Sequence, residues 1–82
     1  MTYGVEFQPP ALRQLNGFPG DALDALVSAM ADVTLRPDDP LRTVPTVDPG
    51  VRRAGFGDAG MVTYEIHEAR RVVMVTDVTW VG

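Results

Sequence analysis

The chain has 82 residues, with 7 arginines and no lysine against 11 Asp+Glu, and a formal net charge of -4. It contains no cysteine, which excludes disulfides and thiolate metal sites, and its acidity argues against strong non-specific binding of nucleic acid. No apolar run approaches the roughly 18 residues that a membrane helix needs, and no start segment resembles a signal peptide. We therefore expect one cytoplasmic domain over residues 1–82, without a membrane partner.

Residues 2–8 predict a first strand, because apolar and polar side chains alternate along them. The apolar side of this strand carries Tyr3, Val5 and Phe7. The two prolines that follow end the strand, since neither can donate a hydrogen bond to a sheet. Residues 10–17 then suit a short helix. Its inward positions are Ala11, Leu12 and Leu15.

A second, longer helix is expected from Asp21 to about Leu35, because apolar residues recur at the spacing of one helix face. These positions are Leu23, Leu26, Val27, Met30 and Val33. Pro37 stops this helix. A tight turn joins the two helices, which predicts a helical hairpin.

Residues 37–50 contain four prolines and no periodicity, so they predict one ordered or semi-rigid loop. Three strands are expected after it, at 51–56, 61–67 and 71–81, with turn residues between them. In the middle strand, Val62, Tyr64 and Ile66 share one face. In the last strand we assign Val72, Met74, Val78 and Trp80 to one face and Val73, Val75 and Val81 to the other. Apolar residues on both faces indicate a central or doubly covered strand.

The element order β-α-α-β-β-β predicts an α+β fold, with a helical hairpin packed on one face of a mostly antiparallel four-stranded sheet. The first strand must pair with the later strands to bury its apolar side. The opposite face of the sheet would have no helices, and would be solvated or covered by a partner.

The sequence offers little that suggests a metal or a nucleophile. His67, the only histidine, has Glu65 on the same strand face and Glu68 beside it. This group would hold an ion weakly, and an exposed histidine next to a turn is the commoner interpretation, so we expect neither metal nor cofactor. Ser28, the only serine, lies within a predicted helix without the motif that activates a nucleophile.

The arginines carry the remaining chemistry. Arg52-Arg53 and Arg70-Arg71 each split across the two faces of a strand, because neighbouring side chains point opposite ways. One member of each pair, with Arg42 from the loop, would form a positive patch for an anion, RNA included, or for an acidic partner segment. The alternative is ordinary surface ion pairs, each of little energy. The candidates for contacts with a partner protein are Glu65, His67 and Trp80.

The order of elements and several local strings resemble the RelE/ParE superfamily of bacterial type II toxins over nearly the whole chain. Tyr3 to Phe7, followed by Pro10-Ala11, is similar to the first strand and helix start of the family. Arg53 to Asp58 and then Val62 to Ile66 resemble its hairpin, R-x-R-x-G-D-Y-R-x-x-Y-x-I. The string VVMV at 72–75 resembles its last core strand.

The resemblance implies a small toxin that a cognate antitoxin neutralises, and that acts on mRNA at the ribosome or on DNA gyrase. In the members that cleave mRNA, basic groups hold the phosphate while the 2′-OH attacks it, and acid–base groups move the protons. Arg53 matches the first arginine of the hairpin and is the one catalytic position that the motif transfers. The second falls on Gly55, and the third near Gly60 or Met61.

The family also ends in a basic stretch, which DVTWVG replaces here at 77–82. We therefore expect a toxin that inhibits translation or another essential target, with weak or absent mRNA cleavage. Two alternatives remain open. One is a non-catalytic protein-interaction domain of the same fold, and the other is a ribosome-dependent mRNA endoribonuclease.

Overall fold

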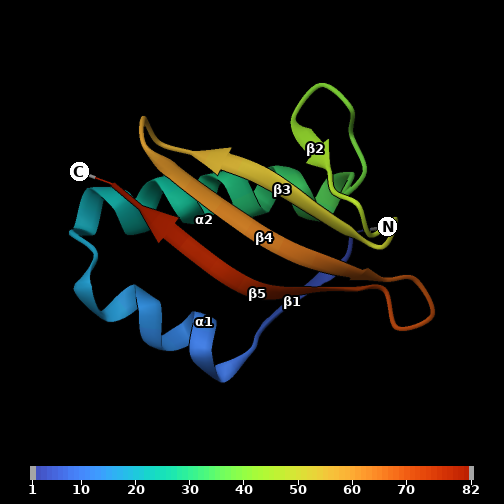
Figure 1. Cartoon of the computed structure of the whole chain (residues 1–82), viewed down its shortest axis with the longest axis horizontal. Helices are drawn as coiled ribbons and strands as arrows, with labels where there is room; N and C mark the ends of the chain where they lie inside the picture. Colours follow the sequence, from blue (N-terminus) through green and yellow to red (C-terminus); the bar gives the residue numbers. More distant parts are fainter. Residues whose placement is uncertain (1, 82) are drawn as a thin grey trace.

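A five-stranded sheet in the order β1-β5-β4-β3-β2 carries two helices, as the computed structural model of residues 2–81 shows (Figure 1). The strands are β1 (Gly4–Phe7), β2 (Thr43–Pro45), β3 (Val51–Phe56), β4 (Gly60–His67) and β5 (Val72–Trp80). The helices are α1 (Pro9–Gln14) and α2 (Gly20–Leu35), with a 3-10 turn, η1 (Leu15–Gly17), between them. The predicted α+β class is confirmed, although the sheet has one strand more than expected.

The first strand pairs with one of the later strands, as expected, but its partner β5 runs parallel to it. Gly4 lies opposite Val72 and Phe7 opposite Val75, while all the other strand pairs are antiparallel. Parallel neighbours require a long crossover connection, which the helices and the intervening strands supply here. β1 therefore forms one edge of the sheet, and its Val5 stays 37% exposed.

The expected loop at 37–50 was wrong in one respect, because it contains β2 at the other edge of the sheet. Pro45 is compatible with this place, since an edge strand has one side on which no backbone donor is needed. Thr43 is buried, and its hydroxyl donates to the carbonyl of Asp39 (2.7 Å) and accepts from Nε of Arg52 (2.8 Å). A buried threonine thus fixes the short strand to its neighbour.

The predicted faces of the last strand were also wrong, because β5 contains a bulge. Thr63 pairs with Asp77 and Tyr64 with Val75, so Thr76 is an extra residue without a partner on β4. The bulge shifts the alternation, and Val78 therefore points into the same core as Val75.

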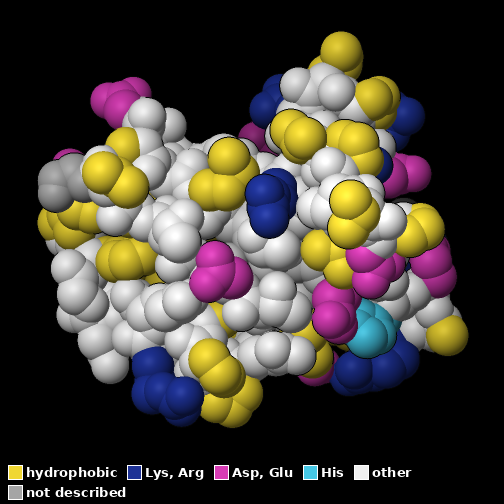
Figure 2. Space-filling model, in the orientation of Figure 1, with side chains coloured by type: hydrophobic (Ala, Val, Ile, Leu, Met, Phe, Trp, Pro, Cys, Tyr) yellow, Lys and Arg dark blue, Asp and Glu magenta, His cyan; other side chains and the backbone are white. Residues whose placement is uncertain are grey.

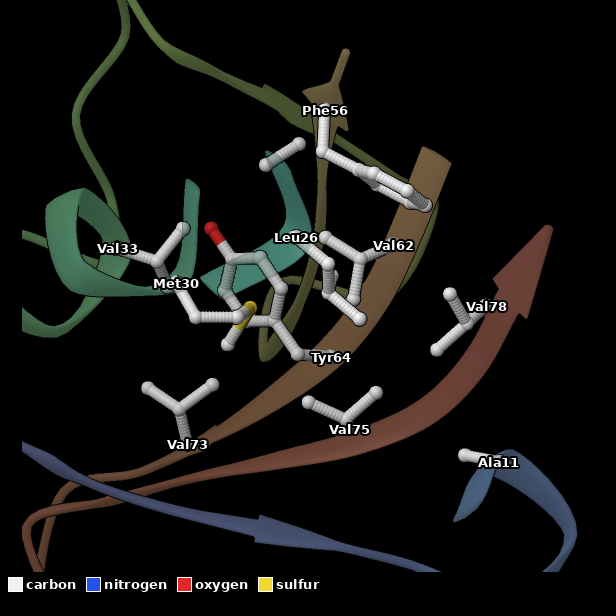
Figure 3. Packing of buried hydrophobic residues seen from close by; sticks show 11 residues of the cluster. Ala11, Leu26, Met30, Val33, Phe56, Val62, Tyr64, Val73, Val75 and Val78 are labelled. Carbon is white, nitrogen blue, oxygen red and sulfur yellow. The ribbon is translucent and has the colours of Figure 1, made fainter. Parts of the chain in front are cut away.

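The hydrophobic core lies between the sheet and α2, which crosses one face behind β3 and β4 in Figure 1. Leu26 and Met30 of α2 pack there against Tyr64, as expected (Figure 3). Two other inward assignments were wrong, since Val27 is 69% and Leu12 55% exposed. No helix among residues 2–81 is long and apolar enough to cross a membrane.

The short helix α1 continues the edge of β5 where β1 ends. The side-chain amide of Gln14 donates to Oδ1 of Asp77 (2.9 Å) and accepts from the backbone N–H of Val78 (2.7 Å). The backbone N–H of Gln8, at the end of β1, donates to the carbonyl of Val75 (2.9 Å). Gln14 thus makes hydrogen bonds to β5 that a neighbouring strand would otherwise make. α1 therefore lies at the edge of the sheet, and α2 covers its face.

Candidate functional site on the open face of the sheet

No helix of residues 2–81 covers the face of the sheet opposite α2, and we call this face the open face. Figure 2 views it in the orientation of Figure 1, with hydrophobic, acidic and basic side chains interspersed. The strand registers place alternate residues on it. They are Glu6, Val44, Val51, Arg53, Gly55, Met61, Thr63, Glu65, His67, Val72, Met74, Asp77 and Thr79. None of them is fully buried.

Arg53 lies in the middle of β3, one strand from the β2 edge of this face, and is exposed. It stands opposite Val44 of β2 and Thr63 of β4, and makes no hydrogen bond or ion pair with any residue of the described chain, 2–81. Its side chain borders a shallow depression of about 430 Å³ against β2 and the residues that follow that strand. The guanidinium is therefore available to a ligand.

The carboxylate of Asp77 lies on the same face as Arg53, in the same row of residues across the strands. Thr63 pairs with Arg53 on one side and with Asp77 on the other, so Arg53 and Asp77 face the same way, two strands apart. Strands lie about 4.8 Å from their neighbours, which puts the two positions roughly 10 Å apart. The amide of Gln14 holds the Asp77 carboxylate from the edge.

Glu65 and His67 form a second polar group on β4, towards the β4–β5 turn. Nε2 of His67 lies 2.9 Å from Oε1 of Glu65, and both side chains are about 40% exposed. Their partners across the sheet are apolar, Met74 for Glu65 and Val72 for His67. Within the described chain, no three histidine or carboxylate side chains meet as metal ligands would.

The structure does not gather the other predicted arginines around Arg53. Arg52 points to the α2 side of the sheet, where it donates to the hydroxyl and carbonyl of Thr43. Arg42 lies beside α2, with NH1 3.1 Å from Oδ2 of Asp32. Both arginines therefore make local contacts away from the open face.

Arg70 and Arg71 lie in the β4–β5 turn, before β5 begins. Arg70 forms an ion pair with Glu6 of β1 (2.7 Å). Arg71 lies over the ring of Tyr3, 4.7 Å from its centroid, and its NH1 is 3.9 Å from Oε2 of Glu68. The Tyr3 hydroxyl donates to the Glu68 carboxylate, which raises the pKa of that phenol. The turn is thus a cluster of paired charges, as the alternative interpretation of the arginines proposed.

Trp80 lies apart from Glu65 and His67, on the α2 side of the sheet. Its ring centroid is 6.1 Å from that of Phe18, and its side chain is half-buried. It borders a cavity of about 340 Å³, together with Asp21 at the start of α2 and Asp58 in the β3–β4 turn. The three predicted partner contacts therefore belong to two separate surfaces.

An apolar groove of about 460 Å³ between β1 and α2 was not predicted. Its lining is Val5, Phe7, Leu15, Leu23, Leu26, Val27, Met30, Ala31 and Thr34. The N–H groups of Gly4 and Gln8 point to β5, so the backbone groups of Val5 and Phe7 point away from the sheet by alternation. The groove therefore runs beside a free strand edge. The sequence signal for this groove was the surplus of apolar residues on α2, especially Val27.

No protein-family profile and no curated protein matches the sequence. Solved structures match the fold over almost the whole chain. An arginine-to-alanine mutant of the E. coli toxin RelE, in complex with a peptide of antitoxin RelBc, superposes with a TM-score of 0.85 at 17% identity. That match covers 100% of this chain and 86% of the RelE chain.

Two complexes from other organisms have the same fold. The toxin–antitoxin complex RelBE2 from Mycobacterium tuberculosis matches with a TM-score of 0.83 and 25% identity, over 99% of this chain and 100% of the other. The archaeal RelE–RelB complex from Pyrococcus horikoshii gives 0.72 and 18%, over 98% and 96%. The fold inferred from the resemblance is thereby confirmed.

Proposed function

We propose that this chain, which belongs to the RelE superfamily by its fold, is the toxin of a type II toxin–antitoxin pair. The match of the whole fold to RelE, at a TM-score of 0.85 with all of this chain covered, carries the proposal. Structures of RelE with RelB antitoxins recur among the similar proteins, which supports a cognate antitoxin as the partner. The toxin acts as a single domain of residues 1–82 in the cytoplasm.

The apolar groove between β1 and α2 is the surface best suited to the antitoxin. It is lined almost wholly by apolar side chains, and Val5 and Val27 are exposed at its rim. A contiguous apolar surface on a small protein is typical of an interaction site. The groove takes the apolar side of an antitoxin segment, and the neighbouring free edge of β1 offers it backbone hydrogen bonds.

On its target, the toxin acts with weak or absent mRNA cleavage. Cleavage through attack of the 2′-OH builds negative charge on the phosphate, which several cations must stabilise. Arg53 is free on the open face, but Asp77 stands across the same row and Glu65 on the next strand. Two carboxylates on the same face as the one guanidinium oppose that charge. Inhibition of translation or of another essential target by binding is the mechanism that this arrangement favours.

Growth assays test the toxin–antitoxin pair. Expression of the chain should arrest bacterial growth, and co-expression of a short neighbouring gene that encodes an antitoxin should restore it. Val27→Arg should weaken antitoxin binding and rescue, because it places a charge in the groove. Leu12→Arg makes the same change at another exposed helix position outside the groove, and should leave rescue intact.

A second assay separates the mechanisms. Purified protein added to translating ribosomes should give little mRNA cleavage. Cuts at specific codon positions that disappear in Arg53→Ala would instead support the endoribonuclease. Absence of growth arrest, with antitoxin binding retained, would leave the protein-interaction domain as the function.

A further inference from the structure

Carboxylates outnumber arginines on the open face. Glu65 and Asp77 present carboxylates there, and their contacts are with a histidine and an amide. Arg53 is the one arginine on this face of the described chain, and it has no acidic partner among residues 2–81. Arg70 reaches the rim of this face, but its guanidinium already forms an ion pair with Glu6.

Apolar side chains separate these charges. Met74 lies directly opposite Glu65, and Val51 flanks Glu65 on the other side. Met61, which pairs with Thr79 on β5, is 39% exposed. Methionine adapts its shape to a partner, and such side chains are common on surfaces that bind protein segments. The open face therefore places apolar side chains next to the carboxylates of Glu65 and Asp77.

This pattern favours a protein over a nucleic acid. Each phosphate of RNA that is neutralised contributes to affinity, and Arg53 alone can neutralise one while Glu65 and Asp77 repel the others. A protein segment with arginine or lysine opposite the two carboxylates is complementary in charge. Its apolar residues would cover Met61 and Met74, which RNA phosphates cannot do.

We propose that the open face docks a basic, partly apolar segment of a protein target. This inference rests on the proposed toxin function, and it names the chemistry of the target that the toxin blocks. The open face is on the opposite side of the sheet from α2 and the groove that borders it. Target and antitoxin therefore use different surfaces, and each surface can be altered separately.

A titration followed by NMR tests the docking surface directly. The probes are a short peptide that alternates arginine with valine, its counterpart with glutamate, and an oligouridylate. The arginine peptide should shift the amide signals of β3, β4 and β5. The double variant Glu65→Gln/Asp77→Asn should raise its Kd about fivefold, which is about 1 kcal/mol. The side chain introduced by Asp77→Asn keeps an oxygen that can accept from the amide of Gln14, so the fold should persist.

The matched control is Asp24→Asn/Asp58→Asn, which removes the same net charge from two exposed acids away from the open face. It should change the Kd less than about twofold. Equal effects of the two double variants, shifts confined to α1 and α2, or tighter binding of the oligouridylate would each overturn the inference.

Growth arrest supplies the second readout. Glu65→Gln/Asp77→Asn should reduce arrest while antitoxin binding at the groove is retained. Full arrest by this variant, with the unaltered chain equally toxic, would contradict the inference. If the unaltered chain is not toxic, the proposed toxin function fails, and the peptide titration still decides whether the open face binds basic protein segments.

Discussion

The phenol of Tyr64 donates a hydrogen bond of 2.6 Å to the backbone carbonyl of Pro37, which lies 27 residues earlier in the chain. Tyr64 is fully buried in the middle of β4, and Pro37 follows the end of α2. The contact therefore fixes the point where the helix gives way to the segment that leads to β2. It joins the helix layer to the sheet by a buried polar bond.

Removal of this bond should destabilise the fold. Tyr64→Phe keeps the ring but leaves a buried carbonyl without a donor, which should lower the free energy of unfolding by about 1–3 kcal/mol in urea denaturation. Tyr3→Phe is the control, because the Tyr3 hydroxyl is bonded to Glu68 at the surface. An unchanged midpoint for Tyr64→Phe would mean that the bond is not formed in solution.

Alkaline pH should weaken the fold through the same residue. Burial raises the pKa of Tyr64 above the value of about 10 that tyrosine has in an unfolded chain. The unfolded state therefore releases the proton first as the pH rises. The contribution of Tyr64 to the free energy of unfolding should be fully present below about pH 10 and should be lost as the pH rises above it. Tyr64→Phe should reduce that fall, and an identical pH dependence in the variant would rule out this assignment.

Gln14 should be essential to the edge of β5. Gln14→Ala removes the acceptor for the backbone N–H of Val78, a residue that is only 1% exposed. We expect a loss of about 1–3 kcal/mol in the free energy of unfolding. Gln8→Ala is matched to it, because the Gln8 side chain makes no hydrogen bond at the start of α1. This control should stay within about 0.5 kcal/mol of the unaltered chain.

Adjacent residues on α2 should differ sharply in their effect on stability. Leu26 is 3% exposed and packs in the core, whereas Val27 is 69% exposed. Leu26→Ala should cost about 2–5 kcal/mol in thermal or urea unfolding. Val27→Ala should change the free energy of unfolding by no more than about 0.5 kcal/mol. Similar losses for both would mean that α2 is rotated about its axis.

Gly60 should not tolerate a side chain. A Cβ at this position, which begins β4, would clash with the ring of Phe56, itself part of the core. Gly60→Ala should therefore cost about 1–3 kcal/mol through displacement of that ring. Gly17→Ala meets no heavy atom within 4 Å, and by reducing the freedom of the unfolded chain it should be neutral or stabilising. Near-ultraviolet circular dichroism would also report the movement of Phe56.

Strict alternation was the most reliable signal in the sequence. It placed Val62 and Tyr64 in the core, because β4 itself contains no extra residue there and pairs with β3 in an unbroken register. The same signal failed in β5, where the bulge at Thr76 inserts one residue and no side chain marks the insertion. The prolines concealed β2, since they suit an edge strand as well as a loop.

The candidate site was predicted only in part, because charge pairing depends on residues that are distant in sequence. Glu65 and His67 share a strand, so their contact could be expected from spacing alone. The pairing of Arg70 with Glu6 joins positions that are 64 residues apart, and follows from the parallel placement of β1. The availability of Arg53 could not be inferred until the partners of the other arginines were known.

The parallel pairing of β1 with β5 also affects synthesis of the protein. Gly4 leaves the ribosome long before its partner Val72 is made, so the first strand has no strand partner until β5 has been synthesised. Contacts so distant in sequence form slowly, because a large loop must close first. A nascent chain that stops before Val72 thus leaves β1 outside the sheet, because the strand that joins β1 to the other strands has not yet been made.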